Sequence, residues 1–180
     1  MEAGLVFLMT LYLQDVLHFG PLTTGLVFGV PGLASVAAGV VAGRIIARRG
    51  ARPVLLAALL VQGGLTAPLI LLGTEPAWLW LLVPALFIGF LGHITAVVAA
   101  TVIATSEVAD ADAGLATGLV TTSQRVAVTV GIPLLGAVMA LRANLLAGIQ
   151  LALVVDVLLT LTVGAMVNAG LRRPRCRTPG

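Results

Sequence analysis

The sequence contains no lysine, a single cysteine and few aromatic residues. The shortages of aromatic residues and of cysteine limit what the protein can bind and how it can be cross-linked. Aromatic side chains make up 4% of the 180 residues, so the stacking platforms of single-stranded nucleic-acid binders are absent. Cys176 has no second cysteine with which to form an intramolecular disulfide. The two histidines, His18 and His93, show no metal-ligand spacing. We therefore expect no nucleic-acid partner, no metal and no cofactor.

Charged residues are also scarce. They make up 9% of the chain, whereas 59% of it is hydrophobic and the mean hydropathy is +1.14. An ordinary soluble domain is about 45–50% apolar and about 25% charged. One core of this size has no room for so many apolar side chains, so most of them are expected to face lipid or other helices within lipid. The expected partner is a lipid bilayer.

The few charges divide the chain into long apolar runs. Five runs are long enough for the ~20 residues that a spanning helix needs, and an apolar run at 3–18 predicts only a partial helix. We expect an all-α polytopic membrane protein with one domain at 1–171 and a basic tail at 172–180. The domain is a bundle of about six helices, the first truncated, and the five spans are predicted at 22–43, 54–73, 77–106, 113–141 and 143–171.

The arginines predict the orientation. Four of the ten lie in the connection at 44–52 and four in the tail, which successive crossings place on the same side of the membrane, while Arg142 lies in an opposite loop. Arginine-rich short loops face the cytoplasm, and the acidic residues between 107 and 112 weigh little in that rule. We therefore expect a multi-pass protein of the plasma membrane with a cytoplasmic C-terminus.

Small residues recur every four positions on two predicted helices. They are Ser35, Gly39 and Gly43 on one helix, and Gly114 and Gly118 on another. Such spacing lets helix backbones approach closely in membranes. It also arises by chance in a chain with 21 glycines, so two interpretations stay open.

Three ionisable residues fall inside predicted spans: His93, Arg125 and Asp156. A charge at the bilayer centre costs at least ~2.5–3.5 kcal/mol and normally faces a partner or a wet cavity. Arg125 and Asp156 each lie ~15 Å deep on consecutive antiparallel helices, so we predict that they pair, either statically or with Asp156 exchanging a proton. His93 is interpreted as a hydrogen-bonded neutral imidazole or as a proton relay. Single ionisable groups on separate helices do not predict an enzyme.

The connection between the first two full spans carries a recognisable motif. Its sequence, GRIIARRGARP, resembles the cytoplasmic loop of the major facilitator superfamily, whose pattern is G-x-L-x-D-R-x-G-R-R. The matching positions are Gly43, Arg48, Gly50 and Arg52. Ala47 stands where that family has an aspartate.

Two further segments resemble the 14-helix drug:proton antiporter branch of that superfamily. They are YLQDVLHFGPLTTGL, which begins at Tyr12, and AGLATGLVTTSQ, which begins at Ala113. Gln14 and Gln124 within them are our candidates for the substrate path. The resemblance implies the C-terminal half of a proton-coupled efflux transporter, which would handle a small molecule and protons once an N-terminal half completes it. The alternative is a half-length membrane protein that pairs with another transporter without transporting anything itself.

The single thiol offers a test of the orientation. If Cys176 follows the last span into the cytoplasm, a membrane-impermeant maleimide is expected to leave it unlabelled in intact cells and to label it after permeabilisation. Labelling in intact cells would reverse the predicted orientation.

Overall fold

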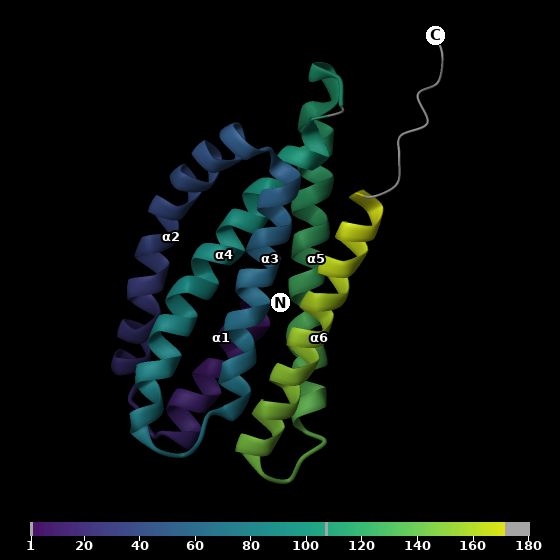
Figure 1. The fold of residues 1–180 in the computed structure, drawn as a ribbon. Coiled ribbons are helices and arrows are strands. Elements are labelled where there is room, and N and C mark those ends of the chain that lie inside the picture. The colour runs from purple at the N-terminus through teal and green to yellow at the C-terminus, as the bar shows by residue number, and fades with distance from the viewer. Residues whose placement is uncertain (1, 107, 172–180) are drawn as a thin grey trace.

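Six α-helices run up and down the bundle in the computed structural model, which describes residues 2–106 and 108–171 (Figure 1). No strand occurs within those ranges. Among the described residues, five spans are long and apolar enough to cross a membrane, and a shorter apolar helix covers Ala3–Val16. The predicted fold class is confirmed. The helices are α1 (Glu2–Leu11), α2 (Pro21–Arg49), α3 (Ala51–Thr66), α4 (Leu79–Thr105), α5 (Ala113–Met139) and α6 (Leu145–Leu171).

Short turns of other helix types extend or precede these helices. α1 continues into a π-helical turn at Tyr12–Val16, and α3 continues into a 3-10 turn at Ala67–Leu71. Pro68 lies near the start of that 3-10 turn and has no N–H to donate to an α-helical hydrogen bond. Two more 3-10 turns, Pro76–Trp78 and Asp110–Asp112, precede α4 and α5. Pro31, Pro84 and Pro133 remain inside α2, α4 and α5, as membrane helices permit.

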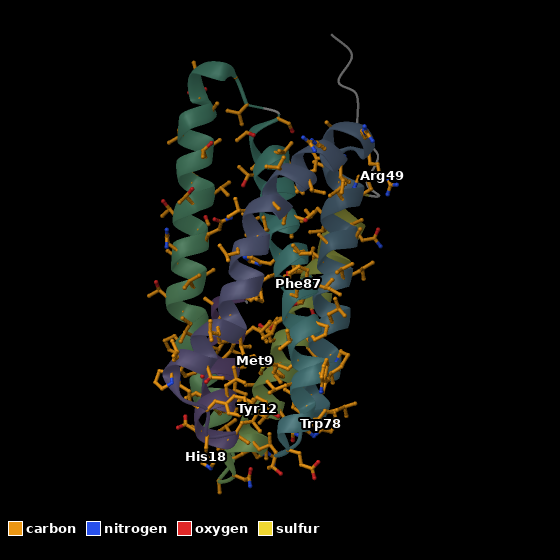
Figure 2. The ribbon with its side chains drawn as sticks, turned by 90° about the vertical axis from the view of Figure 1, so that its left-hand side faces the viewer. Met9, Tyr12, His18, Arg49, Trp78 and Phe87 are labelled. Atoms are coloured by element: carbon orange, nitrogen blue, oxygen red, sulfur yellow. The ribbon has the colours of Figure 1, made fainter. Side chains whose placement is uncertain are left out.

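The helix connections alternate between the two ends of the bundle. The α2–α3 and α4–α5 connections lie at the end where α6 finishes, and the other connections lie at the opposite end (Figure 1). Figure 2 shows Arg49 at the first of these ends, and Tyr12, His18 and Trp78 towards the other. The four arginines of the α2–α3 segment therefore mark one end of the bundle. The basic tail at 172–180 lies outside the described residues.

Helix α1 enters the bundle about halfway along its height and fills the end opposite Arg49 (Figures 1 and 2). Its side chains belong to the larger apolar cluster, where Leu8 and Met9 of α1 and Tyr12 of the following π-helical turn are fully buried. The Tyr12 hydroxyl donates a 2.7 Å hydrogen bond to the carbonyl of Gly73. The Gln150 side-chain amide donates a 3.0 Å bond to the carbonyl of Leu72. These two bonds satisfy consecutive carbonyls where the chain leaves α3's 3-10 turn, and so fix this end of the bundle.

Glycines allow close helix contacts, although not those that the spacing predicts. A Cβ on Gly92 of α4 would lie 3.3 Å from the Ala58 carbonyl of α3, and one on Gly63 of α3 would lie 3.4 Å from Thr160 of α6. The two predicted small-residue stripes make no such approach: a Cβ on any of their glycines would meet nothing within 4 Å. The close-packing interpretation of Ser35, Gly39 and Gly43, and of Gly114 and Gly118, is therefore wrong within this bundle. Both stripes lie on helices that this bundle leaves largely uncovered.

The motif segment after Gly43 is helical rather than a loop. α2 extends past the predicted boundary at 43 and ends at Arg49, so Gly43 and Arg48 are helical, and α3 begins at Ala51, so Arg52 lies in its first turn. The arginines in the last turn of α2 favour a longer helix because they complement the negative end of the helix dipole. Only Gly50 separates the two helices. Its φ of 83° is a left-handed conformation that side chains disfavour, and its N–H bonds to the Ile46 carbonyl at 2.8 Å.

We predict that Gly50→Ala destabilises the protein by about 1–3 kcal/mol, the cost of holding a non-glycine residue in this backbone region. Gly43→Ala is the matched control, because it lies in the same motif in helical backbone with open space around its Cβ. Thermal unfolding in detergent, followed by circular dichroism, is expected to show a lower Tm for Gly50→Ala only. Equal Tm values for the two variants would contradict the conformational role of Gly50.

Candidate functional site

A pocket of about 400 Å³, called here the α4–α5 pocket, lies between α1, α4 and α5, and it gathers three of the polar residues that the sequence singles out. His93 reaches it from α4, and Gln124 and Arg125 reach it from α5. Three of the predicted site residues therefore share one pocket. The remaining lining residues are small or apolar apart from one threonine: Ala3, Val97, Thr121, Ala127 and Val128.

The helical hairpin of α4 and α5 explains why His93 and Arg125 line the same pocket. His93 lies twelve residues before the end of α4 at Thr105, and Arg125 lies twelve residues after the start of α5 at Ala113. At ~1.5 Å per residue each is ~18 Å from the connection, which is near the middle of a ~30 Å hydrocarbon layer. The two side chains therefore lie at the same depth.

The pocket is rich in hydrogen-bond donors. The guanidinium of Arg125 carries five N–H donors and no acceptor, and the Gln124 amide offers both. Both residues are exposed, whereas His93 is half-buried. The Thr121 hydroxyl is already bonded to the carbonyl of Thr117 at 2.9 Å. This arrangement suits an acceptor group, either of water or of a bound molecule, rather than a metal cation.

Gln14, the other candidate for the substrate path, lies elsewhere. It is half-buried in the π-helical turn that follows α1, between the buried Tyr12 and the exposed Asp15. Gln14 is not among the residues that line the α4–α5 pocket. π-turns are frequent at functional sites, but nothing in the sequence pattern predicts one here.

Asp156 occupies a second polar region, on α6. It is 2% exposed and lies one turn before Thr160, whose hydroxyl bonds to the Asp156 carbonyl at 2.9 Å. Thr160 contacts Gly63 of α3, and residues four apart share a helix face, so Asp156 is on the α3-facing side of α6. Gln62 and Thr66 of α3 are also buried polar residues. The α3–α6 interface therefore contains polar residues inside a mostly apolar bundle.

The predicted partners Arg125 and Asp156 thus have different surroundings. Arg125 is exposed in the α4–α5 pocket, and Asp156 is buried on the side of α6 that faces α3. Asp156 does not line the pocket that holds Arg125. Their ion pair remains a prediction, and the pocket that Arg125 lines is also lined by His93.

The described residues do not supply the ligand set of a metal site. Within residues 2–106 and 108–171, no group of three His, Cys, Asp or Glu side chains could hold a metal ion.

Sequence comparison assigns the chain to a family. The model of the Major Facilitator Superfamily matches residues 1–132, which is well over half of the sequence. The chain therefore belongs to the Major Facilitator Superfamily, whose members are membrane transporters rather than enzymes. The multi-pass helical bundle described above agrees with this assignment.

A curated relative adds a more specific likeness. The chain is 33% identical, over 138 residues, to the puromycin resistance protein pur8 of Streptomyces alboniger. The match covers 75% of this chain and 27% of that relative, so the chain spans about a quarter of the relative's length. No solved structure matches the chain significantly.

A double-mutant cycle tests the ion pair. If the predicted pair forms, the stability losses of Arg125→Leu and Asp156→Leu are expected not to add in the double variant; losses that add within about 0.5 kcal/mol, as for two residues that face different helices, would contradict the pair. Tm values in detergent give the three losses. A double variant that is more stable than the sum predicts would instead show that the pair forms, since removing one partner of a buried pair leaves an uncompensated charge.

Proposed function

We propose that this chain forms one half of a proton-coupled exporter of small molecules in the plasma membrane, with its arginine-rich end in the cytoplasm. The α4–α5 pocket lies on the substrate path in this proposal. Family membership supports transport, and the likeness to a puromycin resistance protein supports export of a drug. Drug export and proton coupling are also what the resemblance to the antiporter branch implies.

The exposure of Arg125 carries the proposal. A guanidinium stays charged at any physiological pH and is costly beside lipid at this depth. Arg125 is nevertheless exposed near the middle of α5, and its neighbours Gln124 and Thr121 are exposed too. A water-filled path or a further protein wall is the environment in which such a helix face is stable.

The uneven burial of the helices supports a missing wall. Only 6% of the 18-residue apolar stretch of α5 is buried and 19% of that of α2, against 33% for α4 and 39% for both α3 and α6. Figure 2 shows α5 at the edge of the bundle. Transporters of this superfamily have two six-helix halves with the substrate site at their interface. We infer that the exposed polar face of α5 is directed towards that interface.

Transport by this chain is expected to require a second half. Expressed alone, the chain is expected to confer no resistance to puromycin, because one half lacks the opposing wall of the path. Co-expressed with the N-terminal half of the Streptomyces alboniger relative, it is expected to give puromycin efflux that a protonophore abolishes. Efflux by the purified chain alone in liposomes would contradict the proposal.

A matched pair of variants tests the pocket in the same assay. Arg125→Gln is expected to lower efflux about ten-fold, the effect of losing one charge-assisted hydrogen bond. Arg142→Gln removes the same charge from the exposed α5–α6 connection and is expected to leave efflux unchanged. Equal effects of the two variants would exclude the α4–α5 pocket from the substrate path.

A further inference from the structure

A groove of about 530 Å³ lies between α2 and α3, with α4 as its floor. α2 and α3 meet at Gly50 and diverge from there, and both pack against α4 (Figure 1). The groove is the space between the diverging helices above α4. Its walls include Ile45 and Arg49 of α2 and Ala57 and Val61 of α3, and its floor includes Ile88 and Gly92 of α4.

The groove is apolar along its length and charged only at one end. Arg49 is the one charged residue that lines it, and it lies exposed at the arginine-rich end of the bundle (Figure 2). The hydroxyl of Thr95, which also lines the groove, is occupied by a 2.7 Å bond to the Leu91 carbonyl. The groove is therefore apolar along its walls and positively charged at its Arg49 end, which we call its mouth.

The α3 wall of the groove is about as long as one leaflet of a bilayer is thick. From Pro53, near the Arg49 end, to Val61 its α3 wall is eight residues long, which is ~12 Å along a helix axis. Half of a hydrocarbon core is ~15 Å thick. This wall spans about one leaflet, and the α4 floor, which reaches Ile88, continues past the depth of His93.

We propose that this groove binds an anionic phospholipid of the leaflet at the arginine-rich end, with an acyl chain along α4 and the phosphate on Arg49. The apolar walls exclude water from the chain, and the guanidinium gives charge-assisted hydrogen bonds to phosphate oxygens. Basic pockets between membrane helices on the cytoplasmic side suit anionic headgroups. Of the helices that line this groove, only α4 also lines the α4–α5 pocket, and the site is independent of the transported substrate.

Arg49 also lies in the last turn of α2, where any cation favours the helix dipole. Arg48 lies in the same turn and is equally exposed, but it does not line the groove. Variants of these two arginines therefore distinguish a lipid site in the groove from a general effect of positive charge at the end of α2.

The test measures stabilisation of the full chain in detergent by added lipid. Dioleoylphosphatidylglycerol is expected to raise the Tm of the unmodified chain and of Arg48→Gln at the same concentration. Arg49→Gln is expected to need about five-fold more of this lipid, the factor equivalent to the ~1 kcal/mol that a basic residue contributes near an anionic surface. Equal responses of Arg48→Gln and Arg49→Gln would overturn the proposal.

Three controls define the ligand. Dioleoylphosphatidylcholine and inorganic phosphate are each expected to stabilise less, and an equal effect of either would rule out an anionic lipid. Ala57 is exposed within the groove, so Ala57→Phe fills the groove and keeps every charge. We expect this variant to retain less lipid in native mass spectrometry. Ile88→Trp at the floor replaces this variant if Ala57→Phe does not fold, since Ile88 is 41% exposed. Unchanged retention in the groove-filling variant would overturn the proposal.

Discussion

The contact between α3 and α4 supports the rest of the bundle, because α2 packs mainly on α4 and α6 packs mainly on α3. Gly92 makes this contact close, since a side chain there would meet the Ala58 carbonyl. In a bilayer the lipid tails are as apolar as the helix side chains, so burial of apolar area does not drive such association. Close backbone approach and polar contacts between helices drive the association instead. The polar residues of the α3–α6 interface, Asp156 and Thr160 among them, fit the same principle.

The two least buried long helices, α2 and α5, carry the faces that the proposed second half would cover. Their glycine stripes face open space, and the polar face of α5 lies exposed at mid-membrane depth. Both features are unfavourable in a complete membrane protein and are ordinary at an interface between two halves. The family assignment and the low burial of these two helices therefore agree, although they rest on different observations.

The sequence predicted the helices well because a bilayer permits few alternatives: every backbone polar group must be bonded internally, and long uncharged runs show where. Helix ends were less predictable. α2 continues to Arg49 because arginine suits a helix C-terminus, which hydropathy does not reveal. For the candidate site, the structure brings His93, Gln124 and Arg125 to one pocket, and the pairing of Arg125 with Asp156 stays a prediction. Depth along each helix was readable from the sequence, but whether Arg125 faces α4 or α6 depends on rotation about the helix axis, which charge and small-residue patterns do not fix.

The one-residue connection at Gly50 has a mechanical consequence. A chain advances at most ~3.8 Å between neighbouring Cα atoms, so a single linking residue leaves no slack between the end of α2 and the start of α3. These two helices cannot separate at that end, and any change in the angle between them pivots about Gly50. A tilt of α2 would therefore widen or narrow the far end of the α2–α3 gap while its mouth at Arg49 keeps its width. The arginine-rich end is the fixed point of this pair of helices.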